Sequence, residues 1–279
     1  MNRILRQLLI IALLVVANTA MAQLSLAPTM LFIHDNTNST VLYVANRTNY
    51  AEEVTVSFKF GYLGSDSEGN PVPVYNDSVM AAKYSLSQYL RAFPSRFILK
   101  PNEQQAIRFQ VKPFVNKPDG MYWTRVIVNS SKEAPSINKN INPNKISTNI
   151  NIVFHQNIAA FYSKGIVHTG LQIKNVTTKK KADELYILSD LHLTGDAPFN
   201  GTVHAKLIDK NGKIVGEKSQ TCAVYNDTKR LVKMQFPKDG LPSGSYSLQL
   251  NFETKRADVP AADLAQMEPL VYKMNVSLQ

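Results

Sequence analysis

The sequence predicts an all-β protein of two immunoglobulin-like β-sandwich domains that follow a cleaved signal peptide. Three observations support this prediction: short stretches alternate apolar with polar residues, turn-forming residues separate them, and an apolar segment opens the chain. Alternation with a period of two turns one set of side chains to a core and the other to water. Since strand, helix and strand do not alternate along the chain, antiparallel sandwiches are favoured over a parallel sheet.

Residues 1–22 have the composition of a secretory signal peptide. Arg3 and Arg6 precede an apolar run over 8–16, and residues 20–22 read Ala-Met-Ala, a typical cleavage site. The apolar run is too short for a membrane-spanning anchor. We therefore expect an exported mature chain located in the periplasm.

The first half of the mature chain contains four clear strand patterns and one weak helical pattern. The strands are expected at 40–48, 52–63, 106–114 and 122–130, and the helical stretch is 77–93. Turn signals rich in Gly, Pro, Asn and Asp lie between them. This half is predicted to form the first sandwich, over residues 23–164.

The second half repeats the pattern after a linker-like stretch at 163–170. Strands are expected at 185–195, 202–216, 221–226, 230–236, 245–252 and 270–278. The Asn211-Gly212 pair predicts a hairpin inside the second of these. Residues 165–279 are therefore predicted to form a second sandwich.

Composition limits the classes of partner. The formal net charge is +10, which favours acidic partners, but no basic block is long enough to indicate nucleic acid binding. The densest charged run, 178–184, is expected to be a solvated turn. The single cysteine, Cys222, lies in a strand pattern and is expected to be a buried structural residue rather than a nucleophile.

The sequence shows no pattern for catalysis or metal binding. None of the five histidines pairs with another ligand at metal-site spacing, and His192 and His204 fall inside strands, where packing or surface roles are common. Phosphate loops, nucleophile elbows and zinc motifs are missing from the sequence. We therefore expect a binding protein, with no enzymatic activity, cofactor, metal or small-molecule substrate.

The stretch 149–162 is an alternating strand that follows a polar loop. Ile150, Ile152 and Phe154 occupy every second position. Such a strand either packs on the core of its own domain or offers its apolar side chains to a partner. The pattern alone favours an ordinary core strand.

Four motifs occur in an order that resembles the N-terminal domain of the periplasmic pilus-assembly chaperones, the PapD-like family. They are VANRT at 44–48, FPSRFILKPNEQQAIRFQV at 93–111, KPDGMYWTRVIV at 117–128 and the strand at 149–162. The matching residues are Asn46, Pro94, Arg108 and Asp119. The resemblance covers about 24–164, and the second half matches only a generic sandwich.

The resemblance implies a chaperone that binds surface-fibre (pilus) subunits by donor-strand complementation, a form of β-strand addition. The donor residues would be Ile150, Ile152, Phe154 and Ile158. The implied partners are pilin-like subunits and an outer-membrane usher. The alternative is an exported structural or adhesive protein that uses the same fold without chaperone activity.

The chain departs from the family at the residues that anchor the subunit. The resemblance implies two basic residues in the cleft between the domains, which hold the carboxylate at the subunit's C-terminus. Met30 and Ala159 occupy those positions here, and neither can bind a carboxylate. Three alternatives follow: another cation, such as Lys164 or Arg47, replaces the anchor; the subunit docks differently; or the chain has lost chaperone function.

Overall fold

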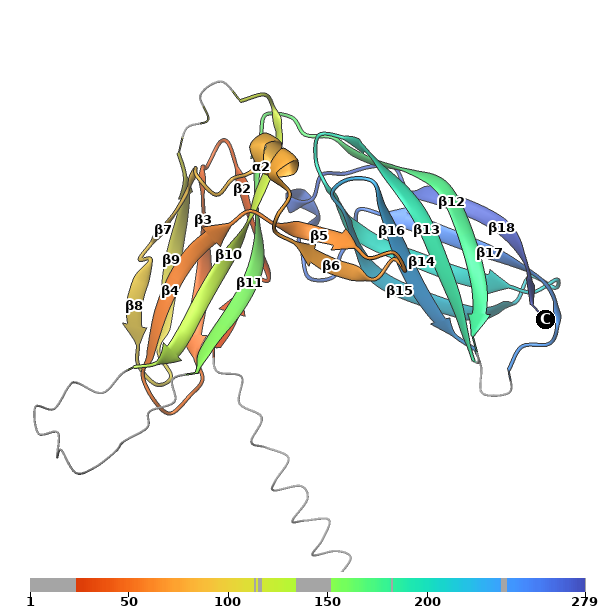
Figure 1. The fold of residues 1–279 in the computed structure, drawn as a ribbon, viewed down its shortest axis with the longest axis horizontal. Helices are drawn as coiled ribbons and strands as arrows, with labels where there is room; N and C mark the ends of the chain where they lie inside the picture. The colour runs from red at the N-terminus through yellow and green to blue at the C-terminus, as the bar shows by residue number, and fades with distance from the viewer. Residues whose placement is uncertain are drawn as a thin grey trace, which may run out of the picture.

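The structure is a computed structural model that describes residues 24–112, 114, 117–133, 152–181, 183–236 and 240–278. It consists of two β-sandwiches that lie at an angle to each other (Figure 1), which confirms the predicted fold class. The predicted signal peptide, residues 1–22, lies outside the described residues. The described part of the chain has no helix that is long and apolar enough to cross a membrane.

The first sandwich packs a four-stranded sheet on a five-stranded sheet. The four-stranded sheet has the order β1 (Leu24–Ala27), β3 (Ser39–Asn46), β9 (Gln104–Val111), β7 (Leu90–Phe93). The five-stranded sheet has the order β2 (Met30–His34), β11 (Val153–Lys164), β10 (Gly120–Lys132), β4 (Glu52–Lys59), β8 (Arg96–Leu99). Alternate residues of both sheets meet in one core that includes Leu42, Ile107 and Val126.

The second sandwich packs a three-stranded sheet on a four-stranded sheet. Their orders are β12 (Thr169–Lys181), β13 (Glu184–Gly195), β16 (Thr228–Gln235) and β15 (Ile214–Val224), β14 (Phe199–Ile208), β17 (Gly244–Glu253), β18 (Leu270–Leu278). The predicted hairpin at Asn211-Gly212 joins β14 to β15, and Cys222 is buried in the core as expected. Since β11 ends at Lys164, we propose the domain boundary there, as the sequence predicted.

Two local predictions were wrong in part. The helical pattern of 77–93 forms only α2 (Ser78–Tyr84), and the stretch then becomes strand β7. The lysines of 178–184 belong mainly to β12 and not to a turn, because Leu171 and Val176 of the same strand are buried in the second core. A strand with one buried face leaves its other face free for charged residues.

The Asn46 side chain explains the VANRT motif. It is fully buried at the end of β3, where its amide group donates hydrogen bonds to the Tyr50 and Leu99 carbonyl oxygens, at 2.8 and 2.9 Å. Its carbonyl oxygen accepts from the backbone N–H and the hydroxyl of Thr48. Asn46 therefore closes the turn after β3 and ties it to β8.

Glu52 is a buried carboxyl group that forms no ion pair with any described residue. Burial raises its pKa, and the Ser130 and Tyr50 hydroxyl groups offset part of this rise. Below the unfolded pKa of 4.5 the group is protonated in both states, so its burial is tolerated. As the pH rises from 4.5 through the folded pKa, the unfolded state loses the proton first and stability falls.

We therefore expect Glu52→Gln to stabilise the protein at pH 7 and to have a smaller effect at pH 4. Urea unfolding at both pH values measures the difference. Equal effects at the two pH values would contradict a raised pKa, and Glu53→Gln, at the half-buried neighbouring position, serves as the control.

Candidate functional site

A hairpin from the first sandwich bridges the two domains. Strands β5 (Tyr62–Ser65) and β6 (Pro71–Val74) leave β4 and lie against the second sandwich (Figure 1). The Leu231 N–H donates to the Gly69 carbonyl at 3.0 Å, and the Ser65 and Thr228 hydroxyl groups hydrogen-bond at 2.8 Å. Gly69 has a φ of 81° and lies against Leu231, so a side chain there would collide with the second domain.

Arg230 is the centre of this bridge. Its side chain is 3% exposed and donates to the Leu63 and Gly64 carbonyls of the hairpin, both at 2.9 Å. It also donates to the Ala223 carbonyl of its own domain at 2.5 and 3.1 Å. Burial lowers the pKa of the Arg230 guanidinium. One buried cation thus joins the two domains through carbonyl groups on both sides, and it also donates to the Thr228 hydroxyl at 3.1 Å.

Aromatic side chains fill the space between the domains. Trp123 stacks on Tyr84 at 4.6 Å between ring centroids and also contacts Tyr225 of the second domain at 5.2 Å. Ala159 is buried in this cluster, and Met30 packs against it. These two residues are direct neighbours on β11 and β2. The positions that the resemblance assigns to a basic pair therefore belong to an apolar interdomain junction.

One edge of β11 is open. The strand pairs with β10 along its whole length, but β2 pairs only with Ala159–Ser163 on the other side. Residues 153–158 therefore have no neighbouring strand on that side among the described residues. The Gln156 amide reaches the Leu24 carbonyl at 3.2 Å, which is a side-chain contact only. An open edge leaves backbone N–H and C=O groups free to pair with another strand.

The predicted donor residues differ in exposure along this edge. Ile152 is 60% exposed and Phe154 is 41% exposed, whereas Ile158 is only 8% exposed and belongs to the core of the first sandwich. By alternation the three share one face. The apolar strip thus starts in solvent and ends in the core. Ile150 lies outside the described residues.

The two candidate anchors lie at opposite ends of the first sandwich. Lys164 ends β11, where its ammonium group donates to the Lys117 carbonyl at 2.6 Å and pairs with Asp119 at 3.2 Å. Arg47 is exposed just after β3. Neither lies level with Met30 and Ala159, because Lys164 is five residues further along β11 and β3 belongs to the other sheet.

Two other cationic side chains share the register position of Met30 and Ala159 on the five-stranded sheet. Arg125 of β10 is directly opposite Ala159, and Lys59 of β4 is directly opposite Arg125. Neighbouring strands are about 4.8 Å apart, so the four side chains form one row on the face toward the second domain. Neither cation forms an ion pair with a described residue. Sequence reasoning missed Arg125 because its neighbours come from other strands.

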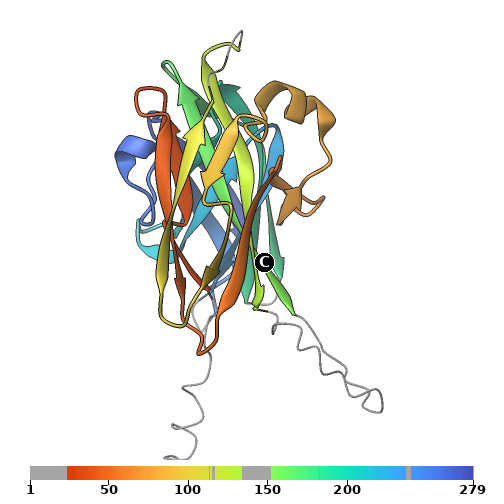
Figure 2. The same ribbon diagram turned by 90° about the vertical axis from the view of Figure 1, so that its left-hand side faces the viewer.

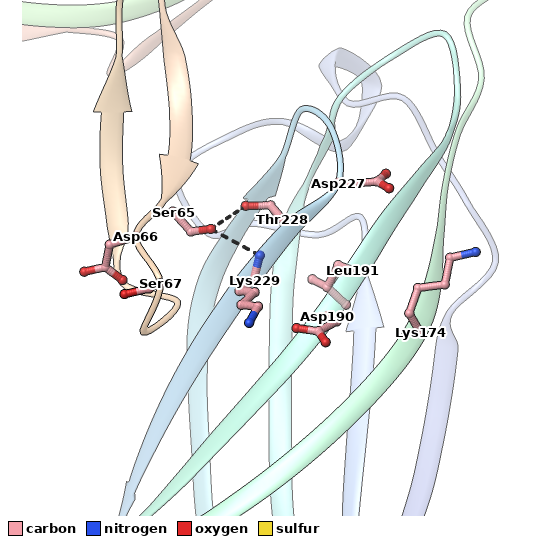
Figure 3. A pocket seen from close by; sticks show the side chains of 9 residues that line it. All are labelled: Ser65, Asp66, Ser67, Lys174, Asp190, Leu191, Asp227, Thr228 and Lys229. Carbon is pink, nitrogen blue, oxygen red and sulfur yellow. Dashed lines mark hydrogen bonds between the residues drawn. The ribbon is translucent and has the colours of Figure 1, made fainter.

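A surface cavity of about 470 Å³ lies between the hairpin and the second domain (Figure 3). It carries three carboxylates and two lysines, but the carboxylates do not converge. Asp66 accepts three hydrogen bonds within its own turn, and Asp227 contacts His192. No three potential metal ligands gather anywhere in the described ranges.

His204 has more partners than the sequence indicated. Its Nδ1 lies 2.7 Å from the Ser219 hydroxyl, and its Nε2 lies 3.0 Å from a Glu253 carboxyl oxygen. This chain of groups has the composition of a Ser-His-Glu triad. Asn251, a potential oxyanion donor, lies on the strand beyond His204. Two strand spacings, about 10 Å, separate the backbones of Asn251 and Ser219.

No model of a known protein family matches this chain, and no curated protein sequence matches it. Several solved structures have a similar fold. The chaperone CsuC of Acinetobacter baumannii, in complex with the tip subunit CsuE of Csu pili, is 14% identical with a TM-score of 0.44, over 90% of this chain and 98% of that chain. The Salmonella enterica SafB chaperone with the SafA pilin is 14% identical with a TM-score of 0.42, over 92% and 98%.

The class 5 fimbriae chaperone CfaA is 13% identical with a TM-score of 0.45, over 90% of this chain and 98% of that chain. All three are chaperones named with pili, pilins or fimbriae.

Proposed function

We propose that the protein is a periplasmic chaperone that binds β-sandwich subunits of surface fibres by adding β11 to them. The supporting observation is the open edge of residues 153–158, next to the exposed side chains of Ile152 and Phe154. Backbone groups of the edge would supply hydrogen bonds, and alternate apolar side chains would fill a groove in the subunit. The protein contributes binding and not covalent chemistry.

Co-expression with an exported fibre subunit tests this function. We expect the subunit to be recovered from the periplasm at one copy per chaperone and to be degraded when the chaperone is absent. Recovery of this chain itself in sheared surface fibres, with no effect on any subunit, would instead support the structural or adhesive alternative.

Arg125 is the cation that we propose as the carboxylate anchor in this chaperone, with Lys59 beside it. Their row is shared with Met30 and Ala159, and the open edge of β11 leads to it. The charge of Arg125 also lowers the pKa of the Tyr225 hydroxyl in the second domain, against the larger effect of burial. A carboxylate entering between the domains would therefore meet a guanidinium group without a competing acid among the described residues.

Replacing Arg125 with Ala is expected to weaken subunit binding by roughly 10- to 100-fold, because a hydrogen bond to a charged group contributes about 1.5–3 kcal/mol. Titration calorimetry with a purified subunit measures the change. Lys164→Ala and Arg47→Ala are the matched variants for the anchors predicted from sequence. A larger loss in either of these, with Arg125→Ala unchanged, would assign the anchor to them.

A further inference from the structure

A second cavity lies between the β5–β6 hairpin and the second sandwich. The hairpin leaves the side of the first sandwich together with α2 (Figure 2), and its tip at Gly69 lies over Leu188 and Leu231. A cavity of about 160 Å³ opens beside this tip, further along the same strands than the cavity of Figure 3. It is separate from the open edge of β11, which belongs to the first sandwich. Nothing in the proposed capture of subunits uses it.

Apolar and cationic side chains meet in this cavity. Leu188 of β13 and Leu231 of β16 are cross-strand neighbours, and both side chains are half-buried. Tyr186 lies two residues before Leu188 on the same face of β13, and the exposed Lys179 of β12 lies directly opposite it. Lys181 also lines the cavity, with its ammonium group 4.4 Å from the centroid of the Tyr186 ring. The cavity therefore combines an apolar floor with ammonium groups at its rim.

The positive charge at this cavity is only partly balanced. Lys233 of β16 approaches the same tyrosine ring, with its ammonium group 5.2 Å from the ring centroid. Glu68 of the hairpin lines the cavity, and Glu184 lies directly opposite Lys181. Within the described ranges of the chain, neither carboxylate forms an ion pair with a lysine. With Lys179, three ammonium groups face two carboxylates, so the local charge is positive.

We propose that this cavity binds a small carboxylic acid with an apolar body, of about the size of benzoate. An apolar cavity of roughly 150 Å³ holds a benzene ring, so a volume of about 160 Å³ fits such a body. The two leucines would contact the apolar body, and the lysines would bind the carboxylate. A cationic ligand does not fit, because lysine ammonium groups already occupy the Tyr186 ring. Since the hairpin belongs to the first domain and the leucines to the second, the ligand would stabilise the docking of the two domains.

Methyl NMR of leucine-labelled protein, with benzoate as the probe, tests the proposal. Shifts of the Leu188 and Leu231 methyl signals during a titration give the dissociation constant. Benzamide, which keeps the ring without the charge, and acetate, which keeps the charge without the ring, are the control ligands. The Lys179→Gln/Lys181→Gln variant removes two cations, and Lys213→Gln in the exposed turn between β14 and β15 is the matched control. Thermal unfolding verifies that each variant folds.

We expect benzoate to bind with a dissociation constant of roughly 1 mM, and at least about tenfold more tightly than benzamide or acetate. Its affinity should fall at least about tenfold in Lys179→Gln/Lys181→Gln and stay unchanged in Lys213→Gln. Glu68→Gln should bind benzoate more tightly, because it removes a carboxylate that repels the ligand. Capture of a fibre subunit should be unchanged in all these variants, so the result is independent of the proposed chaperone function. No methyl shift at about 10 mM benzoate, equal binding of benzamide, or unchanged affinity in the double-lysine variant would overturn the proposal.

Discussion

Aspartate in place of Phe154 or Ile152 is expected to abolish subunit capture while the first sandwich remains folded. Ile152 is 60% exposed and Phe154 is 41% exposed in the free protein, so we expect the free energy of unfolding to change by less than about 1 kcal/mol. In the complex the same position would bury an unpaired charge, which costs several kcal/mol. Capture should therefore fall by more than about 100-fold. Co-purification and thermal unfolding of each variant measure the two effects.

The controls separate a donor strand from an ordinary core strand. Ile158→Asp and Val126→Asp place a charge in the core and should unfold the first sandwich, since both side chains are buried. Phe154→Leu keeps an apolar side chain and should retain most of the capture. If Phe154→Asp lowers the melting temperature as much as Val126→Asp does, the donor-strand proposal is wrong and β11 is a core strand.

Replacing Arg230 with Met is expected to separate the unfolding of the two domains. The substitution removes the hydrogen bonds to the Leu63, Gly64 and Ala223 carbonyls in a buried setting. Each buried group left unpaired costs about 1–3 kcal/mol. At about 2–4 °C per kcal/mol for a protein of this size, a loss of about 3 kcal/mol lowers the melting temperature by about 6–12 °C.

Differential scanning calorimetry of this variant should show two transitions in place of one, because the bridge between the domains is weakened. Lys229→Met is the matched control, since its exposed side chain lies outside the buried bridge. A single transition at the wild-type temperature in Arg230→Met would show that the aromatic junction alone holds the domains together.

Alternation predicted the strands that bury one face against a large core. Strands β3, β9, β10 and β17 were located to within a few residues for this reason. The β5–β6 hairpin was missed because its strands are short, β6 contains two prolines, and its partner surface belongs to the second domain. A contact between domains leaves no periodic signal in either strand. The lysines of β12 predicted a turn because the sequence does not show that Leu171 and Val176 of the same strand are buried.

The sequence predicted which strand carries the candidate site, but it did not predict which residues of other strands lie beside it. Sequence located β11 and the apolar residues at its start, but it could not show that Ile158 is buried while Ile152 is exposed. That difference depends on where the opposite sheet ends. Arg125 and Ala159 are 34 positions apart in the sequence and become neighbours only through strand pairing. The motif match identified Met30 and Ala159 as apolar, and the structure shows the junction that they help to form.

The interdomain aromatic cluster gives the protein a built-in optical reporter. Trp123 is the only tryptophan in the chain, and it lies in this cluster and in neither sandwich core. Its intrinsic fluorescence therefore senses the packing between the domains, with Tyr84 and Tyr225 as its nearest aromatic neighbours. A shift of its emission toward longer wavelength, without loss of β-sheet circular dichroism, would register opening of the junction before either domain unfolds. No label is needed for that measurement.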